Sequence, residues 1–282
     1  ICPYVRSCLD VAINGKLDFL KGAVFVNSCD AMRRLYEVWK RQIKTGFIYL
    51  IDVPKRTGSI DLEYFQNEIK GFIENLHAYF KVTISYDSFD RSIQEYETMR
   101  GLLKKLYQLR KQNPSPISGT DVIKIINNSA ALPVELFSRE CEVFLKEAEQ
   151  NAGSENRSRV RGMPRLLIAG NIVHHPEIFE LIEEAGVEIV ADSICTGSKA
   201  FTINFPEGNN FPQRFAEAYL NKPPCARMMK GSEELDNILQ MIKEYGVDGV
   251  IYHTLKFCDM YLDNIPSAKK FFNANNVKAL FL

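Results

Sequence analysis

Residues 23–28 read Ala-Val-Phe-Val-Asn-Ser, and this run decides the fold class of the chain. A short apolar stretch rich in β-branched residues predicts a buried strand. A helix is expected next over residues 30–44, then a strand over 47–53, a helix over 60–78 and a third strand over 81–85. Strands that alternate with helices in this way predict a parallel sheet that is covered on both faces.

The rest of the chain repeats this alternation after a helical interruption. Residues 88–150 lose strand character, and the polar stretch 151–161 that follows is the expected domain boundary. Further strands are expected over residues 165–170, 187–193, 249–254 and 279–282. The sequence therefore predicts an α/β protein with two doubly wound Rossmann- or flavodoxin-like domains, parallel sheets and a helical insertion between them. The predicted domains are residues 1–155 and 156–282.

The composition is that of an ordinary globular protein and argues against several classes of function. The chain has 282 residues, 46% of them hydrophobic, and Lys plus Arg and Asp plus Glu both number 35. This balance gives no electrostatic case for binding nucleic acid or a membrane, and no apolar run approaches the roughly 18 residues of a membrane span. No P-loop, GxGxxG or HExxH motif is present. The chain does not begin with Met and both ends look cut, so we expect a piece of a longer protein.

Three of the seven cysteines carry the main hypothesis about function. An odd number of cysteines in a chain of this length indicates reduced thiols in the cytoplasm, not a disulfide framework. Cys29 follows the first strand and opens a helix, and Cys258 follows the strand over 249–254 by four residues. The carboxyl ends of parallel strands are where an open α/β sheet gathers its ligands. With Cys2, these thiols would hold an iron–sulfur cluster and leave one iron open, although on spacing alone buried apolar cysteines are the commoner outcome.

Other residues offer weaker candidates, each with a structural alternative. Cys195 precedes a Thr-Gly-Ser-Lys turn over 196–199 whose backbone N–H groups could hold a phosphate, but a plain turn is equally common. His174 and His175 could relay a proton, yet loop histidines are more often surface residues. The role of Cys8 is left open. The residues expected simply to pack are Cys141, Cys225 and His253.

Four longer motifs narrow these alternatives. They are Cys-Pro-Tyr-Val-Arg-Ser at 2–7, Ser-Cys-Asp-Ala-Met-Arg-Arg-Leu-Tyr-Glu at 28–37, Asp-Ser-Ile-Cys-Thr-Gly-Ser-Lys at 192–199 and Lys-Phe-Cys-Asp at 256–259. Together they resemble the subunits of 2-hydroxyacyl-CoA dehydratases and the related benzoyl-CoA reductases, and the resemblance covers nearly the whole chain. Family members continue beyond both ends of this sequence, so residues located there are missing here.

The resemblance implies a set of site residues. Cys2, Cys29 and Cys258 would be the ligands of a [4Fe-4S] cluster, whereas Cys195 and Cys225 would not. The loop that contains Gly197, Ser198 and Lys199 is similar to a family loop that usually ends in arginine, so Lys199 is a departure. A substrate contact by these three residues is a separate hypothesis.

The resemblance also implies an enzyme subunit, a lyase that eliminates water from a 2-hydroxyacyl-CoA. The reaction would pass through a ketyl radical after one-electron activation by a separate ATP-driven iron–sulfur activator. A homologous second subunit would complete a heterodimer. Three alternatives stay open: a benzoyl-CoA reductase subunit, which is an oxidoreductase; a cluster-carrying electron-transfer protein that binds no acyl-CoA; and a structural subunit without metal.

Overall fold

The described residues fall into two units, and each unit is assembled from separate stretches of sequence. The computed structural model describes residues 1–152, 162–208, 210–229 and 231–282. The first unit contains Ile1–Phe89, Asn204–Gly231 and Leu255–Leu262; the second contains Asp90–Ile203, Ser232–Thr254 and Asp263–Leu282. The expected boundary between residues 155 and 156 lies outside the described residues, and that division stays a prediction. Both units draw segments from each side of it.

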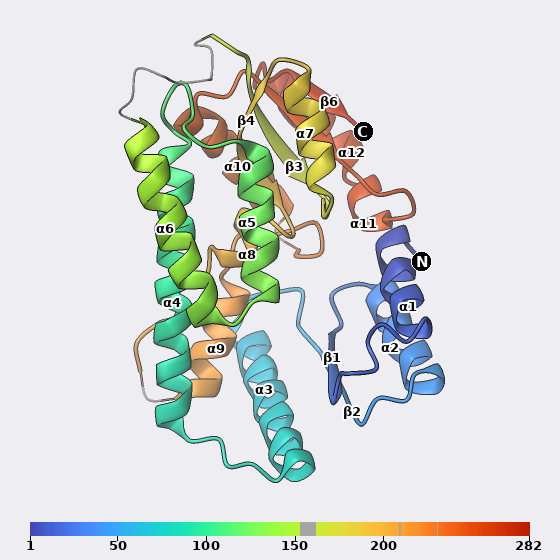
Figure 1. Cartoon of the computed structure of the whole chain (residues 1–282). Coiled ribbons are helices and arrows are strands. Elements are labelled where there is room, and N and C mark those ends of the chain that lie inside the picture. Colours follow the sequence, from blue (N-terminus) through green and yellow to red (C-terminus); the bar gives the residue numbers. More distant parts are fainter. Residues whose placement is uncertain (153–161, 209, 230) are drawn as a thin grey trace. The chain divides into compact units, whose positions relative to one another are not determined.

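Figure 1 shows the helices and strands, coloured along the sequence from blue to red. Those of the first unit are α1 (Pro3–Ile13), β1 (Gly22–Val26), α2 (Asp30–Gln42), β2 (Phe47–Ile51), α3 (Ser59–Phe80), α9 (Phe211–Leu220) and α11 (Asp259–Leu262). Those of the second unit are α4 (Tyr86–Leu109, from Asp90 onward), α5 (Gly119–Ala131), α6 (Val134–Ala152), β3 (Arg165–Gly170), α7 (Pro176–Glu184), β4 (Glu188–Ile194), α8 (Ser198–Phe201), α10 (Gly231–Tyr245, from Ser232 onward), β5 (Gly249–His253), α12 (Ile265–Ala274) and β6 (Ala279–Phe281).

The first unit is built on the parallel pair β1 and β2. Helices α1 and α2 pack on one face of this pair, where Phe25, Leu35 and Trp39 are buried in one cluster. Side chains alternate between the faces of a strand, so Phe47 of β2 points to the other face. There it packs against the rings of Tyr79 and Phe80 of α3. Both faces of β2 are thus covered by helices.

The third strand expected over residues 81–85 is wrong, because this segment is the connection between α3 and α4. Lys81 ends α3 in a left-handed conformation with φ of 53°. The side chain of Val82 is 49% exposed, so the segment buries no apolar face against a neighbouring strand. A run this short does not reveal from its composition whether a strand is there to pair with it.

The second unit contains one parallel sheet in the order β4–β3–β5–β6. Its core gathers Ile168 of β3, Ile189 of β4 and Ile251 of β5 with Phe179 of α7. All of its strands coincide with expected runs, so the α/β class with parallel sheets is confirmed. The doubly wound arrangement of two domains stays a prediction.

The two central strands of this sheet approach closely at their carboxyl ends. Gly170 closes β3 with φ of 108°, and a Cβ atom there would overlap the carbonyl oxygen of His253 in β5. The N–H of Asn171 donates to the same oxygen at 2.9 Å. Only glycine combines this backbone conformation with this close approach.

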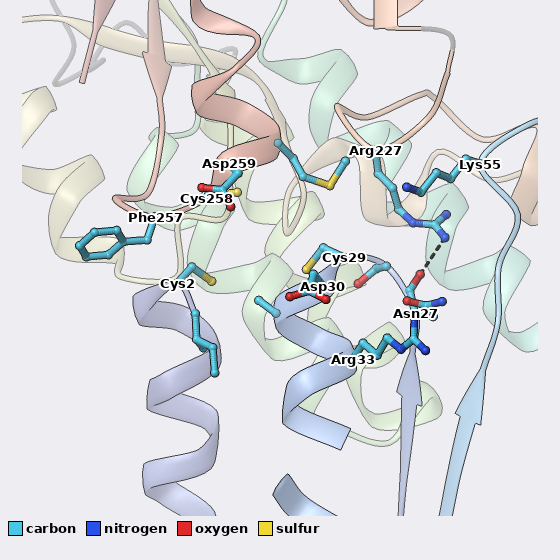
Figure 2. A pocket seen from close by; sticks show the side chains of 14 residues that line it. Cys2, Asn27, Cys29, Asp30, Arg33, Lys55, Arg227, Phe257, Cys258 and Asp259 are labelled. Atoms are coloured by element: carbon cyan, nitrogen blue, oxygen red, sulfur yellow. Dashed lines mark hydrogen bonds between the residues drawn. The ribbon is translucent and has the colours of Figure 1, made fainter. Parts of the chain in front are cut away.

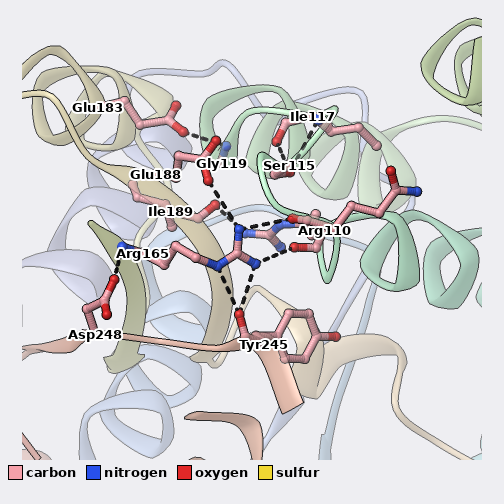
Figure 3. A network of polar contacts seen from close by, with 11 residues as sticks. Arg110, Ser115, Ile117, Gly119, Arg165, Glu183, Glu188, Ile189, Tyr245 and Asp248 are labelled. Atoms are coloured by element: carbon pink, nitrogen blue, oxygen red, sulfur yellow. Dashed lines mark hydrogen bonds and ion pairs between the residues drawn. The ribbon is translucent and has the colours of Figure 1, made fainter. Parts of the chain in front are cut away.

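Two buried arginines join the sheet to the connection that follows α4 (Figure 3). The guanidinium of Arg165 donates to the carbonyl oxygens of Arg110 and Tyr245 at 2.9 to 3.0 Å and pairs with Glu188 at 3.2 Å. Arg110 in turn pairs with Asp192 at 3.4 Å. Burial lowers the pKa of Arg165, and nearby carboxylates act against this. The network fixes the segment after α4 against β3 and β4.

No helix in the described part of the chain combines the length and the apolarity that crossing a lipid bilayer requires.

Candidate functional site

Cys2, Cys29 and Cys258 line one cavity of the first unit, although they come from three separate stretches of sequence (Figure 2). The cavity has a volume of about 450 Å³, which is within the range of small-ligand sites. Each cysteine directly precedes a helix: α1, α2 and α11 respectively. The structure thus brings together the three residues singled out from the sequence, and their role as metal ligands stays a prediction.

Cys29 reaches the cavity because the chain turns at the end of β1. The N–H of Asn27 donates to the carbonyl of Ile51 at 2.9 Å, and the N–H of Ser28 donates to the carbonyl of Val26 at 2.6 Å. Cys29 then caps α2 in an extended conformation. This places its side chain at the positive end of the helix dipole, where negative charge on a ligand sulfur would be stabilised.

Cys2 holds the same position at the start of α1. It is 8% exposed, and its carbonyl accepts the N–H of Arg6 at 3.2 Å. Pro3 begins the helix, where the missing proline N–H costs no intrahelical bond. Cys8, whose role the sequence left open, packs in the same apolar cluster but does not line the cavity, and burial raises the pKa of its thiol.

Cys258 is placed by a tight turn. Its N–H donates to the carbonyl of Leu255 at 3.0 Å, and Phe257 adopts a left-handed conformation with φ of 66°. The prediction that Cys29 and Cys258 follow strands is confirmed, but these strands, β1 and β5, belong to different sheets. The thiols therefore do not lie at the edge of a single sheet. Cys258 lines the same cavity as Cys2 and Cys29 because residues 255–262 belong to the first unit.

Basic side chains of Arg33, Lys55 and Arg227 also line the cavity (Figure 2). Arg33 lies on the exposed surface of α2, 4.0 Å from Glu37. Arg227 is half-buried, and its guanidinium donates to three backbone carbonyls that follow β1 and β2. Burial lowers the pKa of Arg227, and the acidic groups around it act against this. Sequence reasoning missed Arg227 and Lys55 because single basic residues in loops carry no pattern.

The donor set of the cavity consists of three thiols with the carboxylates of Asp30 and Asp259 beside them. All seven cysteines of the chain are described, and none forms a disulfide. Among the described residues, no group of three or more His, Cys, Asp or Glu side chains is arranged to hold a metal ion. A single ion such as zinc needs its sulfur ligands within about 2.3 Å of one point, whereas an iron–sulfur cluster spreads its cysteines over several irons.

Gly197, Ser198 and Lys199, the expected substrate contact, lie in the second unit at the start of α8. The N–H of Ser198 donates to a carboxylate oxygen of Asp192 at 2.7 Å, and its hydroxyl donates to the Asp192 carbonyl at 2.5 Å. Lys199 is 6% exposed, and its ammonium group pairs with Glu234. These contacts turn the polar groups of the loop toward the protein, and the substrate contact stays a prediction.

The remaining candidates lie in the second unit. Cys141 is buried on α6, where burial raises the pKa of its thiol to about 11, so its expected packing role is confirmed. Burial lowers the pKa of His174 and of His253. His175 is exposed, and its Nδ1 lies 3.8 Å from Oε2 of the exposed Glu177. This is the environment of a surface histidine.

Comparisons with known proteins agree with the motifs. The family model described as 2-hydroxyglutaryl-CoA dehydratase, D-component, matches residues 1–282. The chain is 23% identical over 274 residues to the (R)-phenyllactyl-CoA dehydratase beta subunit of Clostridium sporogenes, covering 96% of this chain and 72% of the relative. It is 24% identical over 272 residues to a benzoyl-CoA reductase subunit of Thauera aromatica, covering 94% and 69%. It is 21% identical over 291 residues to the beta subunit of (R)-2-hydroxyglutaryl-CoA dehydratase of Acidaminococcus fermentans, covering 98% and 73%.

Proposed function

The chain belongs to the 2-hydroxyglutaryl-CoA dehydratase D-component family, and we propose that it is the iron–sulfur subunit of a 2-hydroxyacyl-CoA dehydratase. Such an enzyme is a lyase that removes water from a 2-hydroxyacyl-CoA. The observation that carries the proposal is the convergence of Cys2, Cys29 and Cys258 on one cavity. The three relatives described above are named as enzyme subunits, which supports a catalytic assembly.

The donor chemistry of the cavity fits a [4Fe-4S] cluster. Cysteine thiolates are the usual ligands of such clusters, most often four of them. Three thiols would leave one iron open to an oxygen atom of the substrate. When bound, the cluster would supply a Lewis acid and a carrier of single electrons.

The surrounding residues have roles that follow from their positions. Cys2 and Cys29 lie at the N-terminal ends of α1 and α2, whose dipoles favour the negative charge of thiolate ligands. Lys55 and Arg227 add positive charge to the wall of the cavity, whereas the charge of Arg33 is exposed to solvent beside Glu37. These features stabilise an anionic group within the first unit.

The proposed reaction has to remove a proton that the thioester does not activate. One electron added to the thioester carbonyl gives a ketyl radical anion, which expels the 2-hydroxyl group as hydroxide. The β-proton of the resulting radical is acidic and leaves next. Return of the electron then gives the 2-enoyl-CoA, so the electron is recycled and water is the only group lost.

The proposal includes two protein partners. A homologous second subunit would complete a heterodimer, consistent with relatives whose names mark each of them as one subunit of an enzyme. The electron would come from a separate ATP-driven iron–sulfur activator, as the family resemblance implies; the sequence of this chain, which has no P-loop motif, is consistent with this.

A benzoyl-CoA reductase subunit is the second candidate, favoured by the similarity to the reductase subunit of Thauera aromatica. The same site would then direct electrons into an aromatic ring, and the enzyme would be an oxidoreductase.

Product analysis tests these functions. The chain would be purified without oxygen together with its partner subunit and assayed with activator, ATP and reductant. Formation of a 2-enoyl-CoA from a 2-hydroxyacyl-CoA supports the dehydratase, and a ring-reduced product from benzoyl-CoA supports the reductase. Cys29→Ser should abolish turnover, and Cys225→Ser, outside the cavity lining, should keep it. An assembly that carries a cluster but binds and converts neither ester would be an electron-transfer protein, which contradicts both proposals.

A further inference from the structure

We propose that Arg227 is a positioning residue that holds the Cys29 segment in place and sets the affinity and reduction potential of the cluster beside it. The inference rests on the proposed function, since it concerns a group bound by Cys2, Cys29 and Cys258. Arg227 is separated from Cys29 by most of the chain, yet both line the same cavity (Figure 2).

The guanidinium of Arg227 joins the ends of both strands of the first unit. One terminal nitrogen donates to the carbonyl of Asn27 at 2.7 Å and to the carbonyl of Val53, and the other donates to Pro54 at 3.1 Å. Asn27 follows β1 directly, and Val53 and Pro54 follow β2. Carbonyls past the end of a strand need such partners when they are buried. The guanidinium is a rigid planar fork whose separate nitrogens reach carbonyls of two segments, whereas a lysine ammonium presents its donors from a single nitrogen.

The segment that carries Arg227 is itself fixed against the loop after β2. The N–H of Met229 donates to the carbonyl of Lys55 at 3.0 Å, and the Nε of Arg56 contacts the Met229 sulfur at 3.1 Å. Arg227 connects this loop to the segment after β1, because its guanidinium donates to the carbonyl of Asn27. Asn27 lies two residues before Cys29.

A second set of contacts holds the Cys29 segment through the side chain of Asn27. The side-chain amide of Asn27 donates to Asp52 at 2.7 Å, and the hydroxyl of Tyr64 donates to the other carboxylate oxygen of Asp52 at 2.8 Å. Asn27 is thus bound through its carbonyl by Arg227 and through its side chain by Asp52. Loss of Arg227 would remove the donor to the Asn27 carbonyl and leave the segment attached only through the side chain and the N–H of Asn27.

Arg227 also brings positive charge to the wall of the cavity. Its hydrogen bonds go to neutral carbonyls, and its buried Nε has no partner within the part of the chain that the structure describes. The nearby acidic groups are Asp52, Cys29 and Cys225. A guanidinium that is not neutralised by a direct ion pair favours the more negative state of a neighbouring cluster, whose potential depends on local charge.

The test compares Arg227→Met, Arg227→Lys and a matched control, Arg33→Met, which removes an exposed cation from the same cavity wall. The whole chain is reconstituted with iron and sulfide without oxygen. Three quantities are measured: the rate of cluster loss to a chelator, the midpoint potential by EPR-monitored titration, and hydrogen exchange of residues 27–30 and 52–56 in the cluster-free chain. Circular dichroism checks that each variant folds.

For Arg227→Met we expect faster exchange in both segments, a more negative potential and about 10- to 100-fold weaker retention of the cluster, as for other outer partners of metal ligands. Arg227→Lys should keep the potential near that of the wild type while exchange stays fast, which separates charge from positioning. Arg33→Met should resemble the wild type in all three measurements.

Two outcomes overturn the inference: Arg227→Met with unchanged exchange and potential, or an Arg33→Met variant with the same changes as Arg227→Met. A wild-type chain that takes up no iron instead contradicts the proposed function. Hydrogen exchange in the cluster-free chain then decides the positioning role alone, and unchanged exchange in both Arg227 variants overturns it.

Discussion

The ammonium group of Lys199 forms an ion pair with the carboxylate of Glu234 inside the second unit, where the two side chains are 7% and 2% exposed. Removing one partner of a buried pair leaves the other charge uncompensated. We expect Lys199→Met to lower the free energy of unfolding by about 3–5 kcal/mol, and the double variant Lys199→Met/Glu234→Met to lower it less. Urea denaturation measures both.

Lys124→Met, which removes an exposed lysine from α5, is the control and should unfold like the wild type. A Lys199→Met variant as stable as this control, with a raised KM for the acyl-CoA, would place Lys199 in contact with substrate and contradict the structural role.

Because Gly170 lies so close to the His253 carbonyl, adding one methyl group at this position should change the stability of the chain strongly. Gly170→Ala adds a Cβ that overlaps this oxygen at a backbone φ of 108°, so it should destabilise the chain by more than about 1 kcal/mol. Gly101→Ala, in α4 with nothing within 4 Å of the added atom, should stabilise it by about 0.5–1 kcal/mol. Thermal unfolding of both variants checks this prediction, and equal melting temperatures would refute it.

The buried thiol of Cys141 predicts a loss of stability at high pH. Its pKa is raised by burial to about 11 from the ordinary value of 9.0. Between these values the unfolded chain loses this proton and the folded chain keeps it, so the free energy of unfolding falls as pH rises. Near pH 11 the loss from this group should reach about 1–3 kcal/mol. Urea denaturation at pH 8 and pH 10.5 should show a smaller decline for Cys141→Ala than for the wild type, and parallel declines would contradict the account.

The left-handed conformation of Phe257 in the turn before Cys258 predicts a stabilising substitution. Lys81, Phe257 and Asn276 have φ values of 53°, 66° and 54°. Phe and Lys are strained there, whereas Asn tolerates this region. Phe257→Gly and Lys81→Gly should therefore stabilise the chain by about 0.5–1 kcal/mol, and Asn276→Gly should have little effect. Equal effects at all three positions in thermal unfolding would show that strain is not the cause.

Much of the fold could be predicted because its strands are short apolar runs bounded by polar turns. Residues 165–170 and 249–254 carry this pattern, and both are central strands of one sheet. Residues 81–85 carry a similar pattern without a neighbouring strand to pair with, and pairing is a tertiary property that no local pattern contains.

The cysteines of the site could be predicted because cysteine is a usual metal ligand and their positions relative to the strands can be read from the sequence. Cys29 and Cys258 follow strands, as expected, but their meeting depends on residues 255–262 joining the first unit. The hydrophobic periodicity of the sequence does not predict that residues 255–262 belong to the first unit. Arg227 was missed for a similar reason. Its partners are backbone carbonyls, which every residue has, so no residue type in the sequence identifies them.

The iron and sulfide content of the chain decides whether Cys2, Cys29 and Cys258 together hold a [4Fe-4S] cluster. The most direct test measures iron and acid-labile sulfide in the chain purified and reconstituted without oxygen, beside Cys29→Ser/Cys258→Ser and the control Cys225→Ser. We expect about four of each per chain in the wild type and in the control, and their loss in the double variant. A well-folded wild-type chain without iron, or a double variant that keeps it, would show that these cysteines do not hold the cluster.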